Sequence, residues 1–368
     1  MYIVHVIEPL AGGMVSFMKS LTESMPLDHH LIIHGRREHG MPLEEVRQKI
    51  AAPNIEFICW ESAARKLSPL QDLRAARELF ILLKWLKAEQ RIDVVHLHCS
   101  KAGFIGRVVC RLLCLHHLVF YTPNGAPFAG GESSAANFLY KQLERIAYRF
   151  GGQIICCSSS EQAAYENAGM PAIAVNNGIP YEKIKSSVKA EPKSEKGFFE
   201  IITVGRIVDQ KNPALFNRIA HFCAQFPQLR FVWVGEGNER NVLTAPNIEV
   251  TGWLPEHKVH RRVSEADVYL STARYEGLPF AALEALALQK PMLLSNCTGN
   301  ADLVNGWNGG VFSNWQEAVN KLLRFYNNNS MLRLMGQQSG KHCEYHFNFS
   351  ETFRDYRRLY SEVAHMAC

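Results

Sequence analysis

The sequence Tyr275-Glu276-Gly277-Leu278-Pro279-Phe280-Ala281-Ala282-Leu283-Glu284 connects two short apolar runs, Val268–Ser271 and Met292–Ser295. Its Ala- and Leu-rich second half predicts a helix, whereas both flanking runs have the composition of buried strands. A strand, a helix and a second strand in succession predict a parallel sheet with helices on its faces. This unit therefore indicates an α/β protein with a Gly- and Pro-containing loop between strand and helix.

The same stretch carries two carboxylates eight residues apart, Glu276 and Glu284. Pro279 suits the first turn of a helix, so Glu276 is expected at the helix N-terminus and Glu284 about a turn and a half inside it. A helix N-terminus binds phosphate, and carboxylates accept hydrogen bonds from the hydroxyls of a sugar or ribose. Two solvated charges are the simpler alternative, but the arrangement suggests a nucleotide-sugar pocket.

Short apolar runs alternate with amphipathic segments along the whole chain, which predicts two doubly wound α/β halves. Strands are expected in the first half at Ile3–Ile7, Leu31–His34, Ile55–Trp60, Val94–His98, Leu118–Tyr121 and Ile154–Cys157, and helices at Leu70–Gln90, Ala102–Leu115 and Ala135–Phe150. The second half is expected to add strands at Ile201–Val204, Arg230–Val234, Ile248–Thr251, Val268–Ser271 and Met292–Ser295, followed by a helix over Ser350–Ala364. The predicted domains are residues 1–182 and 198–349, with a polar linker over 183–197 and a C-terminal helix over 350–368. Two such domains predict a cleft that binds a ligand.

Composition excludes several classes of protein. The 368 residues are 47% hydrophobic and 20% charged, which predicts a folded protein, and the net charge of +5 is too small to indicate nucleic-acid binding. Ten cysteines without a CxxC pair are expected to be reduced thiols in a cytoplasmic protein. The chain begins directly with a strand and contains no run of 18 apolar residues, so neither a signal peptide nor a membrane span is expected.

Several strand ends carry residues suited to binding a nucleotide sugar. Gly12 and Gly13 follow the first strand, and glycine there lets the backbone approach a phosphate or sugar. The first strand of the second half ends in Val204-Gly205-Arg206, with Lys211 five residues later, and two cations at the carboxyl end of a strand suit a diphosphate. Gly235 and the pair Gly252-Trp253 close the next two strands, where backbone groups are expected near a base.

In this order the motifs resemble the retaining glycosyltransferases of the GT-B fold, family 4. The resemblance covers most of the chain and is strongest from Gly205 to Leu286, including Gly205-Arg206, Lys211-Asn212-Pro213, Gly235-Glu236-Gly237 and the Glu276…Glu284 pair of an E-x7-E motif. The first half, with His96-Leu97-His98-Cys99-Ser100-Lys101 and Pro123-Asn124-Gly125, is similar to bacterial enzymes that build surface polysaccharides such as O-antigen and capsule. The resemblance implies two Rossmann-like domains, with the C-terminal helix returning to the first.

The resemblance also implies roles for individual residues. Arg206 and Lys211 would stabilise the departing nucleoside diphosphate, Glu276 would contact the transferred sugar, and Glu284 would accept from the ribose hydroxyls. Further donor contacts are implied for Gly13, Gly205, Gly235, Gly252, Trp253, Gly277, Leu278, Pro279 and Phe280. Many relatives have His-Gly where this chain has Asn124-Gly125, so Asn124, or in its place His96 or His98, is a candidate contact to the donor sugar or the acceptor. A histidine in an apolar strand is more often structural, which is the alternative for His96 and His98.

The expected reaction is transfer of a sugar from a nucleotide sugar, with a UDP-sugar favoured, to a saccharide acceptor, lipid-linked by implication. No cofactor or metal is expected, because the sequence has no Asp-x-Asp triplet and the two cations can replace a metal at the diphosphate. Two alternatives remain open: a nucleotide-sugar 2-epimerase of the same architecture, and a non-enzymatic binder of sugar nucleotides.

A basic segment suggests where a lipid-linked acceptor would be met. Residues Arg65 to Arg111 contain ten Lys and Arg against four Asp and Glu, and include an apolar helical stretch with Trp85. Such a face is able to lie on an anionic inner leaflet, although an ordinary helix with a solvated basic side has the same pattern. The expected location is therefore cytoplasmic, with peripheral attachment to the cytoplasmic membrane as a hypothesis.

Overall fold

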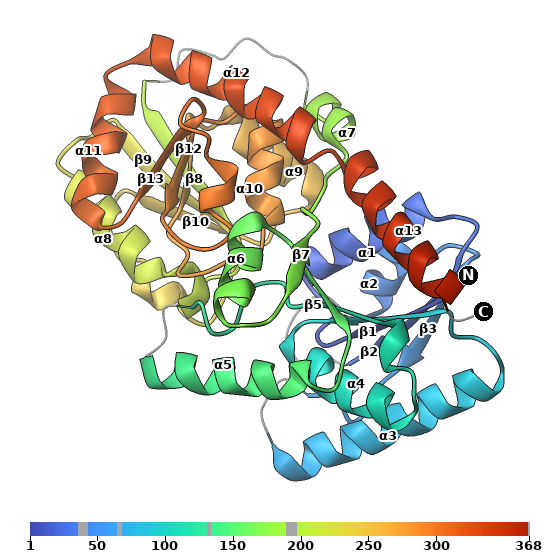
Figure 1. Cartoon of the computed structure of the whole chain (residues 1–368). Helices are drawn as coiled ribbons and strands as arrows, with labels where there is room; N and C mark the ends of the chain where they lie inside the picture. The colour runs from blue at the N-terminus through green and yellow to red at the C-terminus, as the bar shows by residue number, and fades with distance from the viewer. Residues whose placement is uncertain (36–42, 65–67, 131–133, 189–196, 367–368) are drawn as a thin grey trace. The chain divides into compact units, whose positions relative to one another are not determined.

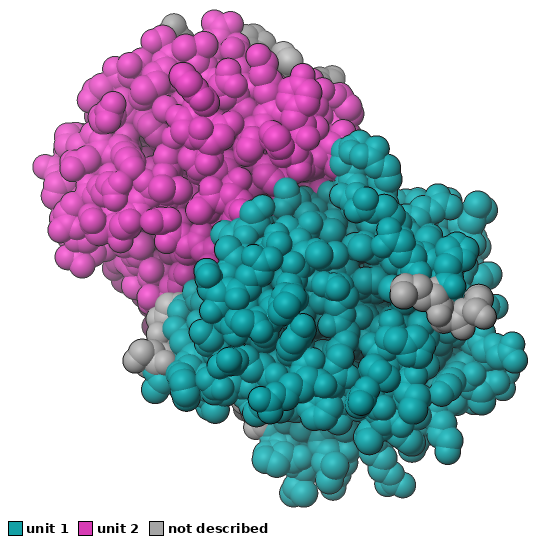
Figure 2. All heavy atoms as spheres, viewed as in Figure 1, with its two compact units in different colours: residues 1–177, 350–368 teal, residues 178–349 magenta. Residues whose placement is uncertain are grey.

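A computed structural model of the chain describes residues 1–35, 43–64, 68–130, 134–188 and 197–366 (Figure 1). Contacts divide the chain into two compact units (Figure 2). Unit 1 consists of Met1–Asn177 and Ser350–Cys368, and unit 2 consists of Gly178–Phe349. The C-terminal segment therefore belongs to the same unit as the N-terminal half, as the family resemblance implies.

The described residues of unit 1 form a seven-stranded parallel sheet with the order β3-β2-β1-β4-β5-β6-β7. Its strands are β1 (Tyr2–Ile7), β2 (His29–His34), β3 (Ile55–Cys59), β4 (Val94–His98), β5 (Val119–Thr122), β6 (Gln153–Cys156) and β7 (Ala172–Ala174). Its helices are α1 (Gly13–Ser24), α2 (Leu43–Ile50), α3 (Pro69–Ala88), α4 (Ser100–Leu112), η1 (His116–Leu118), α5 (Ser134–Tyr148), α6 (Ser159–Asn167) and α13 (Phe349–Met366).

The two faces of this sheet differ in composition. Val4 and Val6 on β1, together with Val95 and Leu97 on β4, belong to an apolar core that α3 and α4 cover. Because side chains alternate along a strand, His5 on β1 points to the opposite face. Helices α1 and α13 cover that face: Phe17 of α1 and Tyr356 of α13 are in edge-to-face contact, with ring centroids 5.6 Å apart. The face covered by α3 and α4 is thus apolar, whereas the opposite face contains buried polar side chains.

The described residues of unit 2 form a six-stranded parallel sheet with the order β10-β9-β8-β11-β12-β13. Its strands are β8 (Phe199–Val204), β9 (Leu229–Val234), β10 (Ile248–Gly252), β11 (Val268–Ser271), β12 (Met292–Ser295) and β13 (Gly309–Phe312). Its helices are α7 (Tyr181–Ser186), η2 (Asp209–Lys211), α8 (Pro213–Cys223), η3 (Arg240–Val242), α9 (Glu256–Glu265), α10 (Phe280–Ala287), η4 (Ala301–Leu303), α11 (Trp315–Tyr326) and α12 (Asn329–His346). Helix α8 packs against α11, and α10 packs against α7, α9 and α12.

The predicted α/β architecture is confirmed, and every predicted strand lies within two residues of an observed one. Two strands were missed, β7 and β13. The predicted linker also differs from the structure, because α7 occupies Tyr181–Ser186 and buries Tyr181 and Ile184. The first four residues of the predicted linker, 183–186, belong to this short helix, and its residues 189–196 lie outside the described residues.

The predicted basic segment is divided among several environments. Arg65 and Lys66 lie outside the described residues. Arg107 is buried, with an Nη2–Oε2 distance of 2.8 Å to Glu144, so its charge is neutralised inside unit 1. Among the described residues, no helix is both long enough and apolar enough to cross a membrane.

Candidate functional site

The candidate site lies in unit 2 where β8 and β11 are neighbours. Strand order reverses between these two strands, since β9 and β10 continue to one side and β12 and β13 to the other. In doubly wound sheets, ligands bind at the carboxyl ends of the strands beside such a switch point. The loop after β8 carries Gly205, Arg206 and Lys211, and the loop after β11 carries Glu276. The topology therefore brings together residues that are some 70 positions apart in the sequence.

Lys211 and Glu276 form an ion pair at this point, with Nζ 2.6 Å from Oε1. Glu276 is buried, and Gln210 Nε2 lies 3.4 Å from its second oxygen and donates to the Tyr275 carbonyl at 3.2 Å. The Thr272 hydroxyl donates to the carbonyls of Lys211 and Asn212, which ties the two loops together. A cation and a carboxylate are thus held side by side at the end of the sheet.

Glycines keep the space around this pair narrow. A Cβ at Gly205, where φ is 149°, would lie 3.2 Å from Lys211 Cε. A Cβ at Gly235, where φ is 141°, would lie 2.1 Å from the carbonyl oxygen of Gly205. Gly299 approaches the other side, since its Cβ would lie 2.4 Å from the Gly277 carbonyl oxygen. At Gly235 and Gly299 the backbone therefore packs against a second loop more closely than a residue with a Cβ would allow, whereas at Gly205 the near atom belongs to the side chain of Lys211.

Helix α10 begins beside the ion pair. Pro279 is its N-cap, one position before the helical turn where the sequence placed it, and Phe280 is the first helical residue. Gly277 and Leu278 form the loop that joins Glu276 to this N-terminus. The free N–H groups and partial positive charge of the first turn therefore lie within a few residues of Glu276. An anion at this helix end would meet both the helix and the cation Lys211.

The remaining predicted donor residues of unit 2 surround the same strand ends. Arg206 directly follows Gly205 and is half-buried. Gly252 ends β10 with φ 73°, and its carbonyl accepts from Gly235 N–H at 3.0 Å, which joins the ends of β9 and β10. Trp253 follows with 64% of its surface exposed. A planar aromatic surface is therefore available near the site.

Glu284 occupies the fifth position of α10. Burial raises the pKa of its carboxyl to about 8, and Glu256 on α9 contributes to this increase. His260 on α9 lies close by, with Nε2 3.9 Å from Glu284 Oε2. The two glutamates of the pair are therefore in different environments, because Glu276 is matched by a cation and Glu284 faces an imidazole.

The predicted residues of unit 1 lie on separate elements. Gly13 is exposed at the first position of α1. Asn124 adopts a left-handed conformation with φ 58°, and its side chain contacts its own unit: Nδ2 donates to the Thr122 carbonyl at 3.2 Å, and Oδ1 lies 3.3 Å from Cys157 Sγ. The following N–H, of Gly125, donates to Glu161 Oε1 at 2.7 Å.

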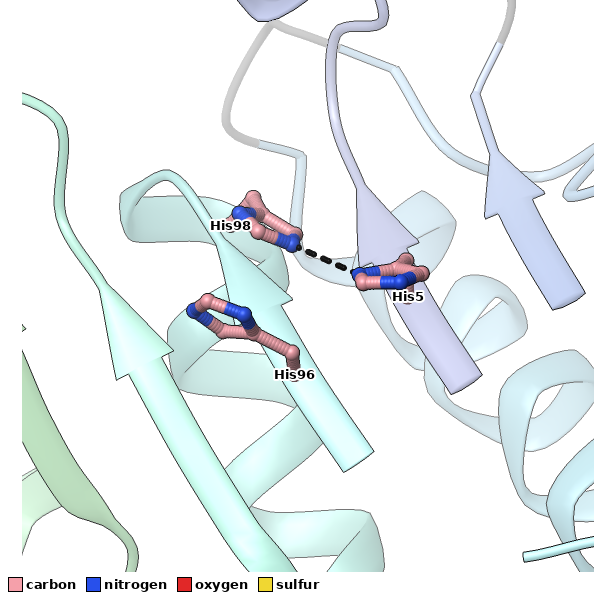
Figure 3. A group of neighbouring side chains, drawn as sticks. All are labelled: His5, His96 and His98. Carbon is pink, nitrogen blue, oxygen red and sulfur yellow. Dashed lines mark hydrogen bonds between the residues drawn. The ribbon is translucent and has the colours of Figure 1, made fainter. Parts of the chain in front are cut away.

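His96 and His98 fit the structural alternative rather than a contact to a sugar, because both are fully buried in unit 1. Figure 3 shows them on β4 beside His5 on β1, and their ring nitrogens lie within 4.8 Å of one another, as metal ligands would. Hydrogen bonds account for five of the six nitrogens. His5 Nδ1 lies 3.2 Å from His98 Nε2, and His5 Nε2 lies 3.1 Å from His30 Nδ1. His96 contacts the hydroxyls of Tyr360 and Thr122 at 2.5 and 2.8 Å.

These contacts identify the histidines as a structural hydrogen-bond network. Burial lowers the pKa values of His5, His96 and His98 well below the usual value, and that of His30 to about 4, so the rings are neutral. Their alternation on β1 and β4 with apolar residues was the only sequence signal, and it does not distinguish a ligand from a core residue.

The structure thus brings together Gly205, Lys211, Gly235, Glu276 and the start of α10. It does not bring His96 or His98 to any exposed surface. Sequence reasoning included Gln210 in the matching motif without giving it a role, and it missed Gly299 and His260. A glycine after a strand was an available signal for Gly299, whereas His260 lies in a highly charged helix that gives no such signal.

Comparison with known proteins gives matches over both halves. The family described as Glycosyl transferases group 1 matches residues 184–342, and the family described as Glycosyl transferase 4-like domain matches residues 12–177. The Escherichia coli UDP-Gal:alpha-D-GlcNAc-diphosphoundecaprenol alpha-1,3-galactosyltransferase is 26% identical, with 98% of this chain and 97% of that protein covered. The E. coli O-antigen biosynthesis glycosyltransferase WbnH is 27% identical, with 66% of this chain and 69% of that protein covered.

A solved structure shows the same fold. Anabaena Alr3699/HepE, crystallised in complex with UDP and glucose, has a TM-score of 0.75 at 14% identity, and 98% of this chain and 99% of that chain are covered. At this identity the similarity concerns the arrangement of the two parallel sheets and their helices.

Proposed function

Because the chain belongs to the GT-B glycosyltransferases of group 1, with a 4-like N-terminal domain, we propose that it transfers a sugar from a UDP-sugar to a lipid-linked saccharide, with retention at the anomeric carbon. The product would be an intermediate of O-antigen, capsule or a related surface polysaccharide. The observation that carries the proposal is the Lys211–Glu276 pair at the β8/β11 switch point, beside the N-terminus of α10.

The donor diphosphate would bind the cations at this site. Negative charge builds on the diphosphate as the bond to the sugar breaks, and fixed cations and N–H groups stabilise that charge. Lys211 Nζ and the Arg206 guanidinium are the cations that follow β8, and α10 contributes the N–H groups of its first turn. With Lys211 bound to the diphosphate, the Glu276 carboxylate would turn to the hydroxyls of the transferred sugar. These groups would make a metal unnecessary at the diphosphate.

Incubation of purified protein with UDP-, GDP- and ADP-sugars, without an acceptor, tests the donor. Thermal stabilisation by one UDP-sugar, with slow release of UDP, is the expected result. Stabilisation by a GDP- or ADP-sugar alone would contradict the donor class. Conversion of the donor to its 2-epimer would identify an epimerase, and binding without turnover in the presence of acceptor would identify a sugar-nucleotide binder.

The reaction is tested with an undecaprenyl-diphosphate-linked saccharide and the selected donor. NMR of the product should show the same anomeric configuration as the donor, and activity should persist in EDTA. An inverted anomeric centre would contradict the retaining mechanism, and loss of activity in EDTA that added metal restores would contradict metal independence.

We also propose that the exposed side of α3 contacts an anionic membrane surface from the cytoplasm. Leu70, Leu73, Ile81 and Trp85 are 47–76% exposed on this helix. Arg74, Arg77 and Lys84 are exposed among them at helical spacing, so apolar and cationic side chains share one face. This mixture is suited to anionic headgroups.

Vesicle sedimentation tests the membrane contact. The protein should bind vesicles that contain phosphatidylglycerol, with binding that decreases as salt increases, and Trp85→Ala should weaken it. Trp60→Phe is the control, because Trp60 is fully buried. Equal binding to phosphatidylcholine vesicles would contradict the electrostatic contribution.

A further inference from the structure

The carboxyl of Glu284 lacks the partners that an ionised carboxylate needs. Its side chain is 24% exposed, on a helix whose residues Ala282, Leu283, Ala285, Leu286 and Ala287 are buried. Among the described residues, no side chain or backbone group donates a hydrogen bond to it. An unpaired carboxylate in such a place is costly, and a neutral acid is not. Burial accordingly raises the pKa of Glu284 to about 8.

The tautomer of His260 follows from its hydrogen bonds. His260 is 3% exposed, and its Nδ1 lies 3.0 Å from the hydroxyl oxygen of Ser187. That hydroxyl donates its proton to the Ile184 carbonyl at 2.6 Å. The oxygen of Ser187 must therefore accept from His260, so Nδ1 carries the hydrogen of the neutral ring and Nε2 carries a lone pair.

The lone pair of His260 Nε2 is buried and has no hydrogen-bond partner in the described part of the chain. Glu284 Oε2 lies 3.9 Å from this nitrogen, too far for a hydrogen bond in the empty site, so a transfer of the proton requires the two side chains to move closer. A lone pair facing a carboxylate is repulsive, whereas a lone pair facing a protonated carboxyl is able to accept its proton. The two side chains are therefore complementary only when they share one proton between them.

The other groups around Glu284 are consistent with this arrangement. Helices α7, α9 and α12 and strand β11 pack against α10. On these elements Tyr181, Tyr269 and Cys343 have raised pKa values and are neutral at physiological pH, and the charged group that acts on both residues is Glu256. Its negative charge opposes ionisation of Glu284. Burial is the larger influence on His260 and lowers the pKa of its imidazole, and the charge of Glu256 acts against that decrease. The charge of Glu256 therefore makes it less favourable for the two side chains together to release a proton to solvent.

We propose that Glu284 and His260 are a proton-sharing pair that senses the nucleotide ribose: Glu284 holds the proton when the site is empty and passes it to His260 Nε2 when the ribose hydroxyls donate to Glu284. The Glu284 O–H bond breaks and an Nε2–H bond forms, leaving a carboxylate beside an imidazolium with no net change in charge. The inference rests on the proposed function, and within it His260 is a positioning residue for the donor.

Calorimetric titration with UDP at pH 7, in buffers of different ionisation enthalpy, measures the proton directly. Wild-type protein should bind UDP with almost no exchange of protons with the buffer. His260→Asn removes the acceptor, so binding should release up to one proton and weaken about tenfold, because a carboxyl with a pKa near 8 must then ionise at pH 7. The loss of affinity in His260→Asn should disappear by pH 9, where the carboxyl of Glu284 is already ionised before UDP binds.

Two controls separate this role from a structural one. UDP lacking both ribose hydroxyls should bind wild type, His260→Asn and Glu284→Gln equally. Glu284→Gln is isosteric with the protonated acid and should bind UDP without proton release at any pH. If His260→Asn binds UDP as tightly as wild type and releases no proton, the proposal of a proton-sharing pair is wrong. It is also wrong if the substitution weakens the binding of UDP and of UDP lacking the ribose hydroxyls by the same factor. Absence of UDP binding to the wild type would instead overturn the proposed donor class.

Discussion

The carboxyl ends of β1 and β4 in unit 1 and of β8 and β11 in unit 2 are equivalent positions in two sheets of the same strand order. In unit 1, these strands carry a buried, neutral network of histidines: His5 and His96 lie within β1 and β4, and His98 is the last residue of β4. In unit 2, the strands end in glycines and in an ion pair that remains partly exposed. The two central strands therefore carry different groups in the two units: buried histidines within the strands of unit 1, and an ion pair in the segments that follow the strands of unit 2.

The largest effect that this comparison predicts is on turnover. Lys211→Ala should lower the rate of transfer by a factor on the order of 10²–10³, because it removes a cation from the developing charge on the diphosphate. The melting temperature should also fall, because the variant leaves the buried carboxylate of Glu276 without its cation, so turnover is compared at a temperature where both proteins are folded. Steady-state rates with saturating donor, together with thermal unfolding, measure both quantities.

A matched control is available in the same unit. Lys321 forms an ion pair with Glu317 at the same 2.6 Å distance, but on the surface of α11. Lys321→Ala should therefore leave turnover unchanged. Equal activity in the two variants would show that the β8/β11 end is not the catalytic position.

Acid should destabilise unit 1 before unit 2. The folded-state pKa values of His5, His30, His96 and His98 are lowered, so the network is fully stabilising above pH 6.5 and is lost as the pH falls. The pKa of His30 is lowered from 6.5 to about 4. Protonation of this one ring should therefore reduce the free energy of unfolding by about 3 kcal/mol as the pH falls below 4. In unit 2 the raised pKa of Glu284 acts in the opposite direction, since its protonated form is favoured by folding and stability increases as the pH falls from about 8.

Hydrogen exchange between pH 7.5 and 4.5 distinguishes the two units. Protection should decrease first in β1 and β4 and later in β8 and β11. His30→Gln should reduce the pH dependence of the stability of unit 1 by about one proton. His117→Gln, at an exposed position, should leave that pH dependence unchanged. Simultaneous loss of protection in both sheets would contradict the assignment of the network as the acid-sensitive element.

The glycines that keep the unit 2 site narrow predict an effect on stability. Gly235→Ala should cost about 3 kcal/mol, because φ is positive and the new methyl would meet the Gly205 carbonyl oxygen. Gly306→Ala is the control, since φ is 82° there and nothing lies within 4 Å of the new Cβ, so only about 1 kcal/mol is expected. Denaturant unfolding measures the free energy of unfolding of both variants. Equal losses of stability in Gly235→Ala and Gly306→Ala would mean that the close contact at Gly235 does not contribute to stability.

The two sheets also show how far sequence reasoning extends. Long apolar runs such as β8 and β11 were predicted because they have the composition of buried parallel strands. Strand β13 was missed because it begins with Gly309-Gly310, and Gly309 is required where a Cβ would lie 1.9 Å from the Met292 carbonyl oxygen. Helix α7 was assigned to a linker because Tyr181 and Ile184 alone mark its buried side.

At the candidate site, the motif spacing was enough to select Lys211 and Glu276. It was not enough to show that they form an ion pair, because that depends on which strand ends are neighbours. His96 and His98 were selected for their chemistry and proved to be core residues. Their burial comes from α1 and α13, which are distant in the sequence from β4, and no local pattern contains that information.

The smallest effect concerns the open side of the unit 2 site, where the aromatic ring of Trp253 is 64% exposed beside Gly252. If the ring stacks on the base of the donor, Trp253→Ala should raise the KM for the donor by about tenfold and leave kcat unchanged, since a base–aromatic contact contributes about 1–3 kcal/mol. Trp307→Ala is the matched control, because Trp307 is 77% exposed in the same unit. A fall in kcat for Trp253→Ala would place the ring near the reacting atoms, and equal KM values for both variants would assign it to ordinary surface. Either result would sharpen the contrast with unit 1, where the rings of His5, His96 and His98 on the corresponding strands are fully buried.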